Sequence, residues 1–207
     1  MRITIMGSGG VGGYFGARLA HAGCDVTFVA RGAQLAALRA RGLRIESARG
    51  DLHLPKVQTT DRPADIGSTD LVLLGVKLWD TASAAEAIKP LVHGQAAVIS
   101  FQNGVAKDDI LRDALGAPAV VGGVCYIAAT IAEPGVIRHT GTMQKLVFGE
   151  LDGQRSERVA RFRDACASAG IDHEVSSDIR QAIWEKFVFL VGISGATTTM
   201  RVPLGVV

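Results

Sequence analysis

Apolar and polar positions along this chain follow the pattern of a β/α protein. Near-continuous apolar runs, which are typical of strands buried on both faces of a sheet, occupy residues 2–6, 25–30, 70–77 and 96–101. Helical periodicity separates these runs at about 11–22, 33–41, 81–91 and 107–115. The alternation predicts an α/β fold of the Rossmann type, in which helices cover both faces of a doubly wound parallel sheet.

Other segments depart from this alternation. Two short alternating runs flank Ala48-Arg49-Gly50-Asp51 and predict an inserted hairpin. An apolar run at 119–129 and the segment 136–150, joined through Glu133-Pro134-Gly135, predict antiparallel strands that complete the sheet, followed by a helix at about 154–169. Ser176-Ser177-Asp178 then predicts the cap of a long helix. We therefore expect a first domain over 1–177 and the beginning of an all-helical domain over 178–207.

Composition narrows the classes of function. The 207 residues are 48% hydrophobic and 20% charged with a net charge of +2, so the chain can bury a full core and presents no basic footprint for nucleic acid. The glycines at 7–13 interrupt the N-terminal apolar stretch too early for a signal peptide, and the apolar segment 187–200 is shorter than the roughly 20 residues of a membrane span. We expect a cytoplasmic protein that acts on small molecules and has neither a nucleic-acid nor a membrane partner.

The three cysteines carry no metal or disulfide signal. Cys24, Cys125 and Cys166 are far apart and odd in number, and no CxxC pair or other zinc-ligand spacing is present. We expect reduced thiols in the core and no metal site.

The N-terminal glycine loop carries the strongest functional signal. Gly7-Ser8-Gly9-Gly10-Val11-Gly12 reads G-x-G-x-x-G directly after a predicted strand and at the start of a predicted helix, which is the dinucleotide-binding pattern. Gly7 permits the tight turn, Gly9 lets the backbone approach a pyrophosphate, and Gly12 lets the helix pack on the strand. Free amides at the helix N-terminus would face the phosphates. The alternative is an ordinary glycine-rich turn.

The end of the second strand indicates which nucleotide binds. A protein that binds NAD presents a carboxylate there to the ribose hydroxyls, whereas this chain has Arg31. Arginine offers a fork of donors that suits a 2′-phosphate, so NADP is favoured as the cofactor. A solvated arginine at a strand end is the alternative.

Three polar residues follow apolar segments where ligands gather in a doubly wound sheet. Lys77 ends one strand and Asn103, in Gln102-Asn103-Gly104, ends the next; a solvent-facing charge and a plain turn are the alternatives. Lys186 opens the apolar helical run 187–192, where an ammonium group must reach solvent, pair or lose its proton. It is a candidate general acid with a lowered pKa, and pairing with Glu185 is the alternative.

Together these segments resemble the ketopantoate reductase (2-dehydropantoate 2-reductase) family. The resemblance rests on MGSGGVGGYFGARLAHAG, ARG, VKLWDT, SFQNGV, VIRHTGTMQKLVFGE and IWEKFVFLVG, in that order, and covers essentially the whole chain. It implies an oxidoreductase that reduces ketopantoate to pantoate with NADPH, in the route to pantothenate and coenzyme A. It also implies a helical second domain for substrate binding and dimerisation, hence a homodimer.

The resemblance also assigns roles. Lys186 would be the general acid that protonates the carbonyl oxygen and stabilises the developing alkoxide. Asn103 would contact substrate and nicotinamide, Lys77 would assist substrate or cofactor binding, and Arg31 would hold the 2′-phosphate. Ser194 would line the substrate pocket.

The chain departs from the family in two places. Family members often carry asparagines one and two turns after the lysine, where this chain has Leu190 and Ser194. Because leucine offers no hydrogen bond to a substrate hydroxyl, another 2-oxoacid is an alternative to ketopantoate as the natural substrate. Family chains are also longer, and supply an acidic residue from later helices. We expect this chain to be a truncated part of a longer protein, or to be covered by a partner copy, because its apolar helix at 183–194 would otherwise be exposed.

Other functions stay open. A non-catalytic NADPH-binding sensor would keep the glycine loop and Arg31 without using Lys186. A reductase of a different 2-oxoacid would keep all the cofactor features. His139 is an alternative acid, although a histidine beside Thr140-Gly141 is more often a satisfied residue at a strand.

Overall fold

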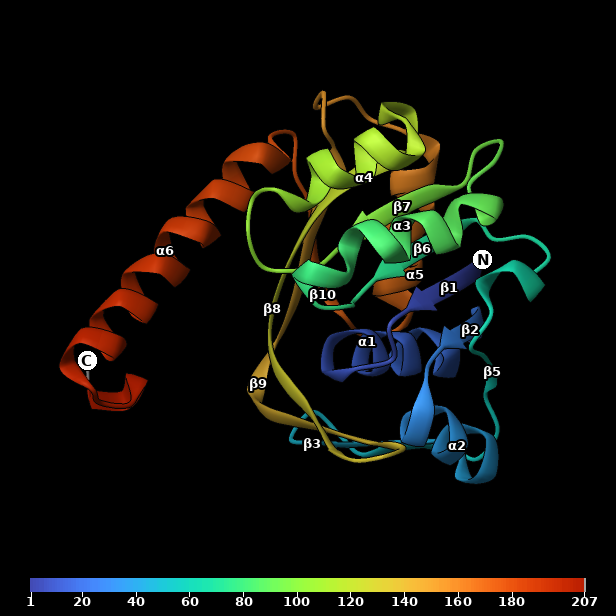
Figure 1. Ribbon diagram of the computed structural model, residues 1–207, viewed down its shortest axis with the longest axis horizontal. Helices are drawn as coiled ribbons and strands as arrows, with labels where there is room; N and C mark the ends of the chain where they lie inside the picture. Colours follow the sequence, from blue (N-terminus) through green and yellow to red (C-terminus); the bar gives the residue numbers. More distant parts are fainter. Residues whose placement is uncertain (207) are drawn as a thin grey trace.

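The structure, a computed structural model, describes residues 1–206, over which the chain forms a ten-stranded sheet (Figure 1). Its strands are β1 (Arg2–Met6), β2 (Asp25–Val29), β3 (Leu43–Ser47), β4 (Leu52–Leu54), β5 (Gln58–Thr60), β6 (Leu71–Leu74), β7 (Ala97–Ser100), β8 (Val120–Glu133), β9 (Val136–Glu150) and β10 (Asp172–Val175). The strands β5-β2-β1-β6-β7-β8 lie side by side in that order and are parallel. From β1 the strand order runs through β2 to β5 on one side and through β6 and β7 to β8 on the other, which confirms the Rossmann-type sheet and puts its switch point between β1 and β6.

Six helices connect or flank these strands in the described residues. They are α1 (Gly10–His21), α2 (Gly32–Arg41), α3 (Thr81–Ile88), α4 (Lys107–Leu115), α5 (Glu157–Ser168) and α6 (Ile179–Met200). A short 3-10 turn continues α3 through Leu91, where Pro90 lacks the amide that an α-helix needs.

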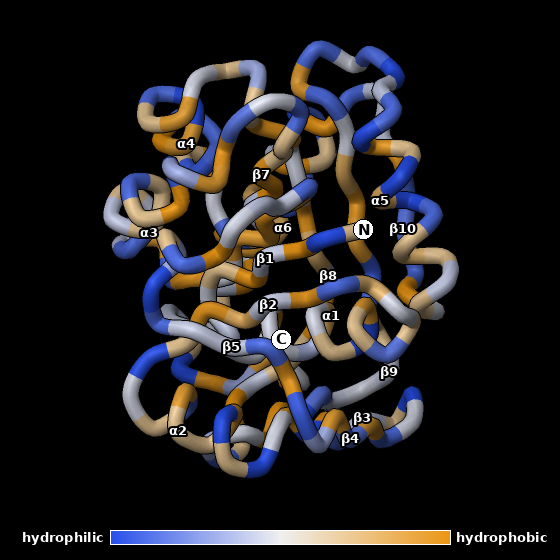
Figure 2. Tube along the Cα trace, turned by 90° about the vertical axis from the view of Figure 1, so that its right-hand side faces the viewer, coloured by the Kyte–Doolittle hydropathy of each residue, from blue (hydrophilic) through white to orange (hydrophobic). Residues whose placement is uncertain are grey.

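Successive side chains of the central strands point to opposite faces of the sheet and pack into two separate hydrophobic cores. In β1, Ile3 and Ile5 pack with residues of α1 and α5, whereas Met6 packs with residues of α3 and α4. In β6, Leu71 and Leu73 join the first core while Val72 and Leu74 join the second. Figure 2 shows hydrophobic segments gathered toward the middle of the molecule, as around β7, and hydrophilic segments mostly toward its periphery. The strands are therefore buried on both faces, as their continuous apolar runs predict.

The region between β2 and β6 is only partly as predicted. The hairpin is confirmed, because β3 and β4 pair antiparallel around the turn at 48–51, with Leu43 opposite Leu54. Two strands are not predicted from the sequence: β5, which follows the hairpin and pairs parallel with β2, and β10, which pairs parallel with β9. Both are short and mostly polar, so they carry no apolar pattern.

The strands β8 and β9 form the predicted antiparallel pair, joined through Gly135 at φ +86°. The strand β9 has the predicted bounds, whereas β8 is longer than its apolar run indicates, since it continues four residues beyond Ala129 to Glu133 as its side chains become exposed. The first residues of β9, Val136 to His139, pair with β3. The β8–β9 pair therefore joins the β3–β4 hairpin to the main sheet.

The helix α6 begins where the sequence predicts. The Asp178 side chain accepts a hydrogen bond from the Gln181 amide (3.0 Å), and Ile179 and Ile183 are buried against β8 and β9. Beyond this first part α6 extends away from the sheet (Figure 1), and large apolar side chains such as Val188 and Phe189 are exposed. The expected apolar exposure of this helix is therefore confirmed. None of the described helices is long and apolar enough to cross a membrane.

Candidate functional site

The loops that follow β1, β2 and β6 enclose a first cavity of about 290 Å³ at the switch point. The predicted residues Gly7, Ser8, Gly9, Arg31 and Lys77 all line it. Ligands of doubly wound sheets bind at this position, outside the carboxyl ends of the strands. The structure thus brings the glycine loop and Arg31 to one cavity.

The glycines of the loop serve different purposes. A Cβ on Gly7, whose φ is +101°, would lie 2.8 Å from the Val76 amide nitrogen, and one on Gly12 would lie 2.2 Å from the Gly7 carbonyl oxygen. These two positions are glycine because the protein's own backbone occupies the space. A Cβ on Gly9 would meet no atom within 4 Å, so this side of the loop is open to a ligand. Gly10 faces β8 instead, since its Cβ would lie 2.1 Å from the Ala129 carbonyl oxygen.

Ser8 fixes the loop. Its side chain is buried and its hydroxyl donates to the Val29 carbonyl at 3.0 Å, an acceptor that it shares with the Gly7 and Ser8 amides. The amides of Gly10, Val11 and Gly12, in the first turn of α1, have no acceptor within the helix, and no side chain of residues 1–206 caps them. Contact between Ser8 or Val11 and a cofactor, through the backbone, stays a prediction.

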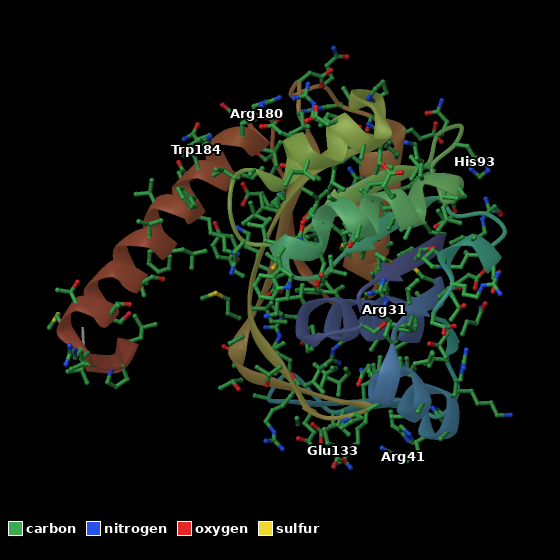
Figure 3. The ribbon with its side chains drawn as sticks, viewed as in Figure 1. Arg31, Arg41, His93, Glu133, Arg180 and Trp184 are labelled. Atoms are coloured by element: carbon green, nitrogen blue, oxygen red, sulfur yellow. The ribbon has the colours of Figure 1, made fainter. Side chains whose placement is uncertain are left out.

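Arg31, labelled in Figure 3, is the exposed N-cap residue of α2. It makes no ion pair within residues 1–206. Beside it, Gln34 donates from Nε2 to the Ser8 carbonyl (3.0 Å) and accepts from the Gly135 amide (2.9 Å). Gln34 is not predicted from the sequence, because nothing but its place in the first turn of α2 marks it. Arg31 therefore presents an unpaired guanidinium group beside a loop held in place by Gln34.

A second cavity of about 610 Å³ continues from the first and contains the remaining polar candidates. Lys77, Asn103 and Lys186 line it together with Gly9 to Val11 of the loop. The structure thus brings residues that follow β6 and β7 to one cavity with a residue of α6.

Lys186 is half-buried, and the groups around its Nζ shift its pKa. Its Nζ donates to the Cys125 carbonyl oxygen and lies 5.3 Å from the centre of the Tyr126 ring. Burial lowers the Lys186 pKa, the Cys125 thiol opposes the shift, and the buried Lys107 ammonium adds to it. The alternative pairing with Glu185 is wrong, because Glu185 accepts from Gln181 Nε2 at 2.7 Å.

Gln102 holds the loop that presents Asn103. Its buried side chain accepts from the Ser100 hydroxyl (2.8 Å) and donates from Nε2 to the Val76 carbonyl (3.0 Å) and the Thr81 hydroxyl (2.9 Å). These bonds tie the end of β7 to the loop after β6. Asn103 itself is exposed at the cavity rim, where its amide is available to a ligand.

Leu190 and Ser194 do not line the second cavity. They lie along an adjoining groove of about 680 Å³ between α6 and the loop at 103–104, and Asn103 lines both spaces. We call this space the α6 groove; its lining is Asn103, Gly104, Phe187, Leu190, Val191, Ser194, Gly195, Thr198 and Thr199.

His139 has a structural role and lines neither cavity. It is 4% exposed, its Nε2 donates to the Met143 carbonyl (2.9 Å), and its Nδ1 lies 2.8 Å from the Ser47 hydroxyl, which can donate to it. Both ring nitrogens are occupied, which favours the satisfied strand residue over the alternative acid.

The second cavity also contains residues that the sequence analysis missed. Trp79 is 79% exposed beside Lys77, and Thr130 and Ile131 reach the cavity from the extended end of β8. An exposed tryptophan two residues after a strand-end lysine is a usable signal, whereas the β8 residues depend on the curl of the hairpin. Among residues 1–206, no group of three or more His, Cys, Asp or Glu side chains is arranged to hold a metal ion.

Comparison with known proteins identifies a family that this chain matches. Residues 3–153 match the family described as Ketopantoate reductase PanE/ApbA. The chain is 33% identical over 206 residues to the uncharacterized oxidoreductase YkpB of Bacillus subtilis (strain 168), covering 99% of this chain and 67% of that protein. It is 35% identical over 207 residues to the 2-dehydropantoate 2-reductase of Mesorhizobium japonicum, covering 90% of this chain and 63% of that enzyme.

A solved structure agrees with these relatives. The crystal structure of 2-dehydropantoate 2-reductase from Geobacter metallireducens GS-15 has a TM-score of 0.90 and 32% identity, covering 97% of this chain and 66% of that one. The chain therefore spans about two thirds of the length of these relatives. It belongs to the ketopantoate reductase PanE/ApbA family.

Proposed function

We propose that this chain carries the cofactor site and the proton donor of an NADPH-dependent 2-oxoacid reductase, with reduction of ketopantoate to pantoate as the reaction that its relatives' names indicate. The observation that carries the proposal is the convergence of the glycine loop, Asn103 and Lys186 on one cavity. A lysine alone in an apolar environment would be an ordinary snorkelling residue, but here it faces the same space as the open side of Gly9.

The residues present fit an NADP cofactor. Space beside Gly9, uncapped amides at the start of α1 and the unpaired guanidinium of Arg31 suit a pyrophosphate and a 2′-phosphate. When bound, NADPH supplies the hydride. We assign cofactor contacts to Gly7, Ser8, Gly9, Gly10, Val11, Gly12 and Arg31, with Lys77 and Asn103 at the nicotinamide end.

The chain's own residues supply the rest of the reaction. Reduction of a 2-oxoacid adds a hydride to carbon 2 and a proton to the carbonyl oxygen. Lys186 donates that proton from Nζ, and its positive charge stabilises the negative charge that develops on the oxygen. Asn103 orients the substrate at the cavity rim, and Lys77 attracts its carboxylate.

We extend the proposal to the domain organisation, the oligomeric state and the localisation of the protein. The segment 178–207 begins an all-helical domain for substrate binding and dimerisation, so that the protein acts as a homodimer in the cytoplasm, in the route to pantothenate. The exposed apolar side chains of α6 support this role, because such a surface is normally covered.

The experiment follows NADPH oxidation with ketopantoate, with NADH as the paired control and Lys186→Met as the matched variant. We expect turnover with NADPH, a loss of at least about 100-fold in kcat in the variant, and unchanged NADPH affinity. Turnover that survives in Lys186→Met would contradict the assigned acid. NADPH binding without turnover of any 2-oxoacid would favour the sensor function.

A second candidate, reduction of a different 2-oxoacid, is favoured by one observation. Leu190, one helical turn beyond Lys186, offers no hydrogen bond to a substrate hydroxyl.

A further inference from the structure

The ammonium group of Lys186 has no carboxylate partner among residues 1–206. Its Nζ donates to the Cys125 carbonyl oxygen and lies 5.3 Å from the centre of the Tyr126 ring. Besides burial, which lowers its pKa, the groups that act on it are the Cys125 thiol and the Lys107 ammonium, neither of them a carboxylate. A half-buried cation needs electron-rich partners to stay charged, and here the carbonyl oxygen and the ring supply them.

The crossing of α6 over β8 places the Tyr126 ring beside Lys186. Val124 and Tyr126 alternate with Cys125 along β8, so their side chains leave the sheet on the face that α6 covers. Ile183 of α6 is buried in one cluster with Val124, and Tyr126 packs against that cluster. Lys186 follows Ile183 by three positions and therefore lies on the same face of the helix. The contact between ring and ammonium is thus fixed by the packing of two regular elements.

The hydroxyl of Tyr126 belongs to a different set of charges. Burial raises its pKa, and Lys145 opposes the shift. Glu185 and Glu174 raise it further, so these charges act on the hydroxyl more than Lys186 does. Tyr126 lies directly opposite Lys145 in the β8–β9 pair, and the Lys145 Nζ is bonded to Glu174 at 2.6 Å. The ring, rather than the hydroxyl, is therefore the part of Tyr126 that acts on Lys186.

An aromatic ring holds an ammonium group without neutralising it. A carboxylate in the same place would raise the pKa of Lys186 and cancel the charge that it presents to a substrate oxygen. The face of a neutral ring attracts the ammonium through its quadrupole and leaves the net charge unchanged. Nζ carries three protons, of which one is donated to the Cys125 carbonyl oxygen, so others remain for the second cavity that Lys186 lines.

We propose that Tyr126 is a positioning residue of this site: its ring, together with the Cys125 carbonyl oxygen, holds the Lys186 ammonium charged and available to the second cavity. The inference rests on the proposed function, since it takes Lys186 as the proton donor. Lys107, whose Nζ is bonded to Asp108 at 2.9 Å, works against the ring, because a like charge nearby disfavours the protonated lysine. The ring and Lys107 thus move the acidity of Lys186 in opposite directions.

An NMR titration tests the inference without a substrate. The full chain would be labelled with ¹³C at the lysine ε-carbons, and the Lys186 signal identified as the one that Lys186→Met lacks. Tyr126→Phe keeps the ring and should leave the pKa of Lys186 unchanged. Tyr126→Leu replaces the ring by an aliphatic side chain and should lower the pKa of Lys186 by about 0.4–1.5 pH units.

The direction of this change separates positioning from simple packing. If Tyr126 only filled space, its loss would admit water to Lys186, and the pKa of Lys186 would rise toward its ordinary value. The pH profile of kcat with NADPH and ketopantoate gives a parallel measurement, because Lys186 acts in its protonated form. The fall of kcat at high pH should move to lower pH in Tyr126→Leu and stay in place in Tyr126→Phe. A partial loss of folding would lower kcat at every pH without moving either midpoint.

The outcomes separate the inference from the proposed function. An unchanged or raised pKa of Lys186 in Tyr126→Leu would overturn the inference and leave the reductase function standing. A pKa that falls equally in Tyr126→Phe would also overturn it, because the hydroxyl and not the ring would then be responsible. NADPH binding without turnover of any 2-oxoacid by the wild-type chain would overturn the proposed function, and the positioning role with it.

Discussion

The neighbouring glycines Gly9 and Gly10 make a matched pair for testing what the loop is for. In Gly10→Ala the new Cβ would lie 2.1 Å from the carbonyl oxygen of Ala129 and 2.5 Å from its carbon, both backbone atoms of β8. In Gly9→Ala the Cβ would meet nothing within 4 Å, and the φ of −80° at this position suits alanine. The first substitution should therefore damage folding and the second should damage binding.

The structure sets the size of each effect. Overpacking against backbone costs about 1–3 kcal/mol, and 1 kcal/mol shifts Tm by about 2–4 °C in a chain of this length, so Gly10→Ala should lower Tm by about 2–12 °C. Gly9→Ala restricts the unfolded chain and should raise the free energy of unfolding by about 0.4–1 kcal/mol. Its cost appears only when a ligand approaches the open side of the loop.

Thermal unfolding with and without NADPH measures both effects on the same samples. At 100 times Kd, bound NADPH should add about 2.7 kcal/mol to the stability of the wild-type chain. This increment should remain largely intact in Gly10→Ala, at a lower starting Tm, and fall close to zero in Gly9→Ala. A Gly10→Ala variant as stable as the wild type, or a Gly9→Ala variant with the full NADPH increment, would refute this reasoning.

Three further predictions follow from the charged groups. Arg31→Ala should weaken NADPH binding about 10- to 100-fold and leave NADH binding unchanged in calorimetric titrations; an equal loss for both cofactors would remove the 2′-phosphate assignment. Because Lys186 acts in its protonated form and burial lowers its pKa, kcat should be level at low pH and fall as pH rises through a value below the ordinary 10.5; a rising limb in the pH–rate profile would contradict this role. Lys107 is 1% exposed, and its Nζ pairs with the Asp108 carboxylate at 2.9 Å. Lys107→Met alone should lower the free energy of unfolding by about 3–5 kcal/mol, because it leaves the Asp108 charge buried without a partner, and the double variant Lys107→Met/Asp108→Leu should recover most of that loss in urea unfolding. An equal loss of stability in the single and the double variant would show that the pair does not act as a unit.

The sequence predicts the central sheet well because strands buried on both faces must be apolar at every position, and such continuous apolar runs are visible in the sequence. The four residues of β6 and the four of β7 are all buried, and their apolar runs are unmistakable. The short strands β5 and β10 leave no such record, since their pairing with β2 and β9 depends on tertiary contacts between polar or exposed residues.

The site divides in the same way. The glycine loop, Arg31 and Lys77 are recognisable because each has a fixed offset from a strand end. The sequence does not show why Gly9 and Gly10 are glycines for different reasons. Gly10 must lack a side chain because the backbone of β8 passes beside it, and the course of β8 is known only from the structure. Lys186 was found as a charge in an apolar helix, but its acceptor, the Cys125 carbonyl oxygen, lies 61 positions away in the chain.

The most direct test of the proposed reaction is to follow the hydride itself. NADPH deuterated at the transferable position of nicotinamide carbon 4 would be incubated with the chain, ketopantoate and 3,3-dimethyl-2-oxobutanoate, and the products examined by NMR. We predict deuterium on carbon 2 of a 2-hydroxyacid, in amounts equal to the NADPH consumed. Tight NADPH binding with no deuterium on carbon 2 of either product would contradict the proposed reductase function.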